Sequence, residues 1–211
     1  MSVLSKIEIL ERIKKGGLSF SPGLDEFQVQ THSVDLRVGF TFLIPKSWEM
    51  NNHGRVSINI DYLAGVDRRY FDVIQLEPGQ YFEVLPKEFM VVAVLEKIKV
   101  PTDLVGVLYP RSSINRRGLS VDLSGIIDAG YSGDLIIPIR NNTSTQVIRM
   151  YPGERFCQIV FHSLETKVRP KKSRYAGKDI LVGILKERSS KEIKLIKEGK
   201  IKELKTHFAI K

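Results

Sequence analysis

The chain alternates hydrophobic and polar positions in a series of short segments, a pattern typical of half-buried β-strands. In residues 33–42, for example, every second residue from Val34 to Phe42 is apolar. The same alternation, or a short continuous apolar run, predicts six further strands, at residues 81–85, 89–95, 104–109, 135–141, 145–150 and 155–161. Turn-forming Pro and Gly residues lie between several of them. We therefore predict an all-β fold, a distorted jelly roll or β-barrel.

Two segments follow the helical period instead. Near the start, Ser5 and Glu8 fit a capping box, and the pair Gly16-Gly17 ends the predicted helix. From about residue 186 onward, apolar residues recur near the helical spacing among Lys and Glu, which predicts an amphipathic C-terminal helix interrupted by Gly199. The polar face of this helix is mixed rather than purely basic. We therefore expect it to pack on the body or on a neighbouring subunit, with membrane-surface binding as the alternative.

The net charge of +9 is concentrated at the C-terminal end of the chain. Residues 1–164 hold 18 basic and 18 acidic side chains, whereas residues 165–211 hold 15 basic and 6 acidic ones. A general nucleic-acid binder more often spreads its positive surface over the folded domain, so we expect no nucleic-acid partner. We divide the chain into a β domain with its N-terminal helix, residues 1–165, and a basic lid with the amphipathic helix, residues 166–211. Such a basic tail suits a phosphate-rich ligand.

The sequence also bears on where the protein works. The longest apolar run, residues 89–95, is far shorter than the roughly 20 residues that a membrane-spanning helix needs. The first residues include acids and lack an apolar core, so we expect no signal peptide. Cys157 is the single cysteine, which excludes an intramolecular disulfide and a cysteine-rich zinc site. We predict a cytoplasmic protein without a membrane partner.

The segment from residue 110 to residue 135 holds the residues best suited to chemistry. Arg111 offers a planar fork of N–H donors, and Ser112 and Ser113 add hydroxyl groups, a set suited to phosphate oxygens. The same string is also typical of a plain solvated turn. Asp128 follows two apolar residues, so it is either a carboxylate presented at the end of a strand or a residue that organises a turn.

Three strings in this region resemble motifs of the trimeric dUTPase and dCTP deaminase superfamily. They are PRSSINRRGLSV (110–121), GIIDAGYSGDLIIPIRN (125–141) and YPGERFCQIVF (151–161), and they occur in this order within 52 residues. The earlier strings SVDLRVG (33–39) and KVPTDLVGVLYPRSS (99–113) are closer to the deaminase branch. The resemblance covers roughly residues 1–178. It implies the fold predicted above and a homotrimer whose active sites are shared between subunits.

The resemblance also implies a role for individual residues. Asp128 activates the water that attacks the α-phosphorus of a deoxynucleoside triphosphate, and Mg²⁺ is held mainly by the nucleotide, with no direct protein ligand. Asp35 is then either an outer residue of the metal site or a structural one. The sugar and the base are expected to contact Tyr131, Gly125 and Ile127. The phosphates are expected to contact Arg111, Ser112, Ser113, Arg116, Gln158 and, on a closing tail, Tyr175 and Lys178.

Position 138 separates the two branches of the superfamily. The deaminase pattern places a glutamate there, which moves protons while water attacks the cytosine ring, but this chain has Pro138. Proline transfers no proton and suggests an edge strand or a bulge. We therefore predict a dUTPase that releases dUMP and pyrophosphate. The alternatives are a dCTP deaminase, with or without dUTP hydrolysis, and a catalytically inactive homologue that binds nucleotide.

Overall fold

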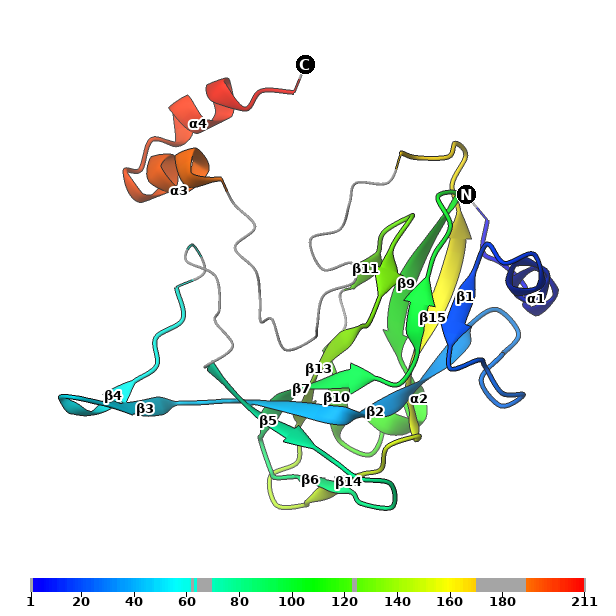
Figure 1. Cartoon of the computed structure of the whole chain (residues 1–211), viewed down its shortest axis with the longest axis horizontal. Helices are drawn as coiled ribbons and strands as arrows, with labels where there is room; N and C mark the ends of the chain where they lie inside the picture. The colour runs from blue at the N-terminus through cyan, green and yellow to red at the C-terminus, as the bar shows by residue number, and fades with distance from the viewer. Residues whose placement is uncertain (1, 62, 64–69, 123–124, 170–188, 211) are drawn as a thin grey trace. The chain divides into compact units, whose positions relative to one another are not determined.

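The computed structural model describes residues 2–61, 63, 70–122, 125–169 and 189–210 (Figure 1). The chain forms two compact units. Unit 1 comprises residues 1–45 and 71–181, and unit 2 comprises residues 46–70 and 182–211. Residues 46–70 therefore belong to the same unit as the C-terminal residues. The predicted domain boundary at residue 165 stays a prediction.

Unit 1 is built from β-strands, with one helix of more than two turns among its described residues. Its largest sheet has eight strands in the order β10-β13-β7-β2-β15-β9-β11, with β5 paired to β2. A three-stranded sheet β1-β8-β12 and a two-stranded sheet β14-β6 complete the unit (Figure 1). The strands are β1 (Ser19–Ser21), β2 (Val34–Pro45), β5 (Phe71–Gln75), β6 (Phe82–Val84), β7 (Phe89–Val94), β8 (Lys97–Lys99), β9 (Leu104–Pro110), β10 (Leu119–Val121), β11 (Ile126–Ile127), β12 (Ser132–Gly133), β13 (Ile136–Asn141), β14 (Ile148–Met150) and β15 (Arg155–Ser163).

The long strands β2 and β15 lie side by side in this sheet and supply much of the core. Val34, Leu36 and Val38 of β2 and Phe156 of β15 are fully buried, because neighbouring strands cover both edges and the other sheets cover one face. Where β2 crosses β7, a Cβ on Gly39 would lie 2.8 Å from the carbonyl oxygen of Ala93. A glycine is therefore required at the point where the register of the two strands shifts.

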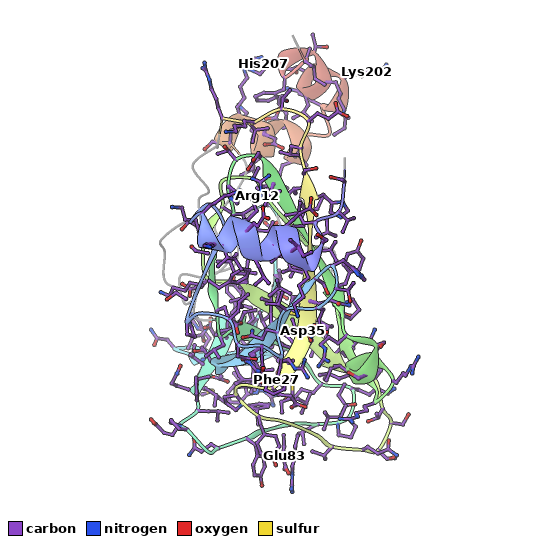
Figure 2. All side chains as sticks on the ribbon, turned by 90° about the vertical axis from the view of Figure 1, so that its right-hand side faces the viewer. Arg12, Phe27, Asp35, Glu83, Lys202 and His207 are labelled. Carbon is purple, nitrogen blue, oxygen red and sulfur yellow. The ribbon has the colours of Figure 1, made fainter. Side chains whose placement is uncertain are left out.

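The N-terminal helix α1 (Lys6–Lys14) forms as its capping box predicts. The Ser5 hydroxyl accepts from the backbone N–H of Glu8, and the Glu8 carboxylate accepts from the backbone N–H of Ser5. The helix buries Ile9 and ties to the strands through an ion pair of 2.7 Å between Arg12 and Asp103. In Figure 2, Arg12 lies toward one end of unit 1, Glu83 of β6 lies at the other, and Asp35 of β2 lies between them.

The described residues of unit 2 form a β-hairpin and two short helices. The hairpin pairs β3 (Trp48–Asn51) with β4 (Gly54–Ser57), and the helices are α3 (Ser190–Lys197) and α4 (Ile201–His207). Lys197 of α3 lies 3.5 Å from the carboxylate of Asp61, and Leu195 is buried. The predicted C-terminal helix is thus present and breaks at Gly199, whose φ of 69° ends α3.

The all-β fold with an N-terminal and a C-terminal helical segment is confirmed. All seven predicted strands exist, whereas the shorter strands β1, β3, β4, β5, β8, β10, β11 and β12 were not predicted. No described helix has the length and apolar character needed to cross a membrane. The cytoplasmic location and the absence of a nucleic-acid partner stay predictions.

One sequence expectation is wrong. Pro138 lies in β13, an interior strand that pairs with β7 through Pro138 itself without a bulge and with β10 from Ile139 to Asn141. The carbonyl oxygen of Pro138 accepts from the backbone N–H of Asp122, just beyond the end of β10. The missing N–H of the proline points to the same side, where the ladder with β10 ends, so the interior strand tolerates it.

Candidate functional site

The Arg-Ser-Ser string forms the turn between β9 and a one-turn helix, α2 (Ser112–Asn115). Arg111 is the N-cap residue, and the buried side chain of Ile114 anchors the turn in the core. Ser112 and Ser113 are exposed at the start of the turn, and Arg116 is exposed at its end. The string is therefore an ordered turn that presents its hydroxyl groups outward, as the phosphate-binding prediction requires.

The side chain of Arg111 forms an ion pair with a buried carboxylate, that of Asp35. Its Nε lies 3.1 Å from Oδ2 of Asp35, and its Nη1 donates to the carbonyl oxygen of Arg155 at 3.0 Å. Arg155 donates from its own Nη1 to the same Oδ2 of Asp35, also at 3.1 Å. The Asp35 side chain is 2% exposed, and burial raises its pKa although the two guanidinium groups oppose this shift.

Gln158 of β15 lies between Asp35 of β2 and Tyr109 of β9 in the sheet register. Its Oε1 accepts from the hydroxyl of Ser33 at 3.0 Å, and its Nε2 donates to the carbonyl oxygen of Pro110 at 3.4 Å. These bonds satisfy the polar groups of the Gln158 side chain within the sheet. The amide N–H₂ group therefore faces the turn that begins at Arg111.

The structure thus brings together Arg111, Ser112, Ser113 and Gln158, with Arg116 on the same turn. The buried side chains of Ser33 and Asp35, together with the half-buried Arg155, form a second layer beneath them. Sequence reasoning did not assign Ser33 or Arg155 a part in the site. Arg155 stands in the Pro-Gly-Glu-Arg string, which was the available signal for it. We call the two layers the arginine-serine group.

The second group of predicted residues lies on the segment from β11 to β12, which we call the Asp128 segment; β11 pairs with β9 and β12 with β8. The Gly125 carbonyl oxygen accepts from the backbone N–H of Leu108, and Ile127 is buried. Asp128 is exposed; its carbonyl oxygen accepts from the backbone N–H of Tyr131 at 3.0 Å, across a turn in which Gly130 has a φ of 82°. The turn therefore fixes the backbone and leaves the Asp128 carboxylate facing outward.

Tyr131 is half-buried against the core. Its hydroxyl donates to the carbonyl oxygen of Asp134, and burial together with the Asp134 carboxylate raises its pKa to about 12. The phenol is therefore protonated at neutral pH. Its predicted contact with a deoxyribose stays a prediction, as do the base contacts of Gly125 and Ile127.

One chain does not bring Asp128 to the arginine-serine group. Ile127 pairs with Gly106, so Asp128 is level with Val105 of β9, whereas Arg111 follows the other end of that strand. Six residues of strand span about 20 Å. Figure 1 shows β11 and α2 at different levels along β9. Asp128 and the arginine-serine group of one chain therefore lie far apart along β9.

Comparisons with known proteins identify the family. The model of a family described as dCTP deaminase-like matches residues 3–164. The chain belongs to this family. A protein named "dCTP deaminase, dUMP-forming" from Sulfurihydrogenibium sp. (strain YO3AOP1) is 34% identical over 177 residues, which are 83% of this chain and 92% of the relative. A protein of the same name from Methanobrevibacter smithii is 32% identical over 171 residues, 79% of this chain and 82% of the relative.

Among solved structures, this chain is similar to the 2'-deoxycytidine 5'-triphosphate deaminase from Agrobacterium tumefaciens. The TM-score is 0.57 at 26% sequence identity, over 75% of this chain. The match spans only about half of that longer protein, 48% of its chain. The similarity confirms the fold and the superfamily that the three strings indicated.

The remaining predicted residues concern the tail and the metal. Tyr175 and Lys178 lie outside the described residues. Within the part of the chain that the structure describes, no three His, Cys, Asp or Glu side chains gather as metal ligands would. Oδ2 of Asp35 lies 3.1 Å from a guanidinium nitrogen of Arg111 and 3.1 Å from one of Arg155. The expected Mg²⁺, held mainly by the nucleotide, stays a prediction.

Proposed function

We propose that the protein hydrolyses dUTP to dUMP and pyrophosphate. The observation that carries the proposal is Pro138, which occupies the position of the proton-moving glutamate and lies in a regular interior strand. The backbone at this point offers no acid or base. The residues suited to a triphosphate, in contrast, stand together in the arginine-serine group.

The relatives named "dCTP deaminase, dUMP-forming" favour deamination, but the product in their name also requires loss of phosphate. Formation of dUMP from dCTP needs two changes, the replacement of the base amino group by oxygen and the loss of two phosphates. The second change needs the phosphate-binding residues and a base for water, and this chain has both. The first change needs the proton carrier that Pro138 replaces. We infer that this chain keeps the hydrolytic half of the reaction.

The chemistry assigns each group one task. Asp128 accepts a proton from the attacking water as its oxygen bonds to the α-phosphorus. The bond from that phosphorus to the bridging oxygen breaks, and pyrophosphate leaves with the electron pair. Arg111 and the amide of Gln158 stabilise the charge that develops on the phosphates, and the hydroxyl groups of Ser112 and Ser113 orient the oxygens.

Magnesium, when bound, neutralises charge on the triphosphate and fixes its geometry. The described carboxylates near the phosphate-binding residues favour a cation carried by the nucleotide, because Asp35 is engaged by arginines. Arg111 and Gln158 would then hold the phosphates that carry the ion. The requirement for Mg²⁺ is part of the proposal.

We also propose a homotrimer whose sites combine two chains. The distance of about 20 Å along β9 between Asp128 and Arg111 supports this assembly. In this proposal, a site is complete when the Asp128 segment of one subunit meets the arginine-serine group of another. The tail that contains Tyr175 and Lys178 would close such a site.

The second candidate is a dCTP deaminase, which the names of the relatives favour. One carboxylate stands beside position 138: Asp122 donates its backbone N–H to Pro138 and is exposed. If deamination occurs, Asp122 is the residue to test for proton transfer. The third candidate, an inactive nucleotide-binding homologue, predicts no turnover of either nucleotide.

Product analysis separates the three candidates. The purified protein is incubated with dUTP or dCTP and Mg²⁺, and the products are separated by chromatography. We expect dUMP and pyrophosphate from dUTP, and unchanged dCTP. Formation of dUMP or dUTP from dCTP at a comparable rate would establish the second candidate, and a test of Asp122→Asn would then follow.

A further inference from the structure

The buried carboxylate of Asp35 has two guanidinium partners on one oxygen. Arg111 from the β9–α2 turn and Arg155 from β15 both lie 3.1 Å from Oδ2, and the Asp35 side chain is 2% exposed. Figure 2 places Asp35 in the middle of unit 1 beside Phe27, whose carbonyl oxygen also accepts from Arg155. Two guanidinium groups, one from the β9–α2 turn and one from β15, thus contact the same carboxylate.

This contact determines which part of Arg111 faces outward. A guanidinium has five N–H groups; within the described residues, Nη1 of Arg111 donates to the carbonyl oxygen of Arg155, and Nε lies in an ion-pair contact with Asp35. Three donors remain for an anion. Without the carboxylate, Arg111 would keep only the bond to a neutral carbonyl and would stand close to the positive charge of Arg155.

We propose that Asp35 is a positioning residue, which fixes the fork of Arg111 so that its three outward donors meet the triphosphate. This inference rests on the proposed function, because it names a residue that prepares the same phosphate site. Asp35 itself touches no phosphate. Its position between two guanidinium groups also argues against direct metal ligation, since a dication beside two positive charges is repelled.

The proposal predicts that Asp35→Asn weakens binding of the triphosphate, whereas simple electrostatics predicts tighter binding. Asp35→Asn removes a negative charge near the phosphate site, so attraction of a polyanion alone would tighten binding. If Asp35 positions Arg111, affinity falls despite the added positive charge. Arg111 would donate a pair of charge-assisted hydrogen bonds to the phosphates, and loss of their orientation should lower the affinity about tenfold or more.

The experiment measures the binding of inorganic tripolyphosphate to the full-length protein by titration calorimetry. Four proteins form a double-mutant cycle: wild type, Asp35→Asn, Arg111→Ala and the double variant. We expect Asp35→Asn to weaken binding about tenfold or more in the wild-type background and to have no effect in the Arg111→Ala background. The KM for dUTP should rise by the same factor as the dissociation constant of tripolyphosphate.

Asp25→Asn is the matched control. Asp25 is also a carboxylate paired with a guanidinium, at 2.7 Å from Arg37, but it has no contact with Arg111 in the described residues. Its substitution makes the same change in net charge and should leave tripolyphosphate affinity within about twofold. Thermal melting of each variant shows whether a loss of binding follows from unfolding.

Several results would overturn the proposal. They are unchanged or tighter binding by Asp35→Asn, an equal loss in both backgrounds, and a wild type that does not bind tripolyphosphate. A wild type that binds tripolyphosphate but does not hydrolyse dUTP would overturn the proposed function alone.

If Asp35→Asn does not fold, NMR of the wild-type protein tests the positioning role instead. The ¹⁵Nε–H signal of Arg111, assigned by its loss in Arg111→Lys, should keep its protection from solvent exchange when tripolyphosphate binds. Loss of that protection would show that Arg111 leaves Asp35, and it would refute the positioning role.

Discussion

Mixing two inactive variants tests how the catalytic site is assembled. Asp128→Asn removes the general base, and Arg111→Ala removes the phosphate fork. The two residues are separated by about 20 Å along β9, so in the proposed trimer each site takes them from different chains. In trimers assembled at random from equal amounts of the two variants, half of the chains carry an intact Asp128, and the other half carry an intact Arg111. About one quarter of the sites should then be complete.

The assay is dUTP hydrolysis after the variants are unfolded together and refolded, compared with each variant alone. We expect about a quarter of the wild-type rate from the mixture and almost none from either variant by itself, since loss of a general base costs about 10²- to 10⁴-fold. Light scattering of each variant should give three times the chain mass of 24.0 kDa. A trimer without recovery on mixing would show that Asp128 and Arg111 of one chain serve the same site.

Three further predictions concern single side chains. Asp128→Asn should lower the rate of dUTP hydrolysis by about 10²-fold or more while tripolyphosphate affinity stays unchanged; a rate within a few-fold of wild type would place the base elsewhere. Ser33→Ala should raise the KM for dUTP by about two- to tenfold, because Gln158 loses the bond that orients its amide, whereas Ser33→Thr keeps the hydroxyl and should behave like wild type. Burial raises the pKa of Tyr131 to about 12, so its stabilising contribution is present below pH 10 and is lost as the pH rises to about 12. Because the ring is partly exposed, we expect wild type to lose about 1 kcal/mol more unfolding free energy than Tyr131→Phe over this interval in chemical denaturation, and equal losses would contradict the shift.

Much of the fold could be predicted because one face of each long strand is buried. Alternation from Val34 to Phe42 and the apolar run at 89–95 follow from that burial, and the Ser5 capping box is a local hydrogen-bond pattern. The two-residue strands β11 and β12 are too short to show a period, and their partners β9 and β8 define them. The position of Pro138 was wrongly assigned to an edge, because its tolerance depends on where β10 ends.

The composition of the candidate site was partly visible in the sequence, but its layout was not. Arg111 and Gln158 were expected at the phosphates, and the register of β15 brings them together. The contact of Arg155 with Asp35 depends on a register shift between Arg155 and Cys157 that no periodicity reveals. The separation of Asp128 from Arg111 was equally hidden, because 17 residues of sequence are compatible with either a close pair or two ends of a strand.

The most direct test of the central claim is to follow oxygen from the solvent. The protein is incubated in H₂¹⁸O with dUTP and, separately, with dCTP, and the products are analysed by mass spectrometry. Attack of water on the α-phosphorus places one ¹⁸O in the phosphate of dUMP and none in pyrophosphate, and dCTP is recovered unlabelled. Label in pyrophosphate would contradict attack at the α-phosphorus, and label at the 4-oxygen of a uracil formed from dCTP would show that the chain deaminates its substrate despite Pro138.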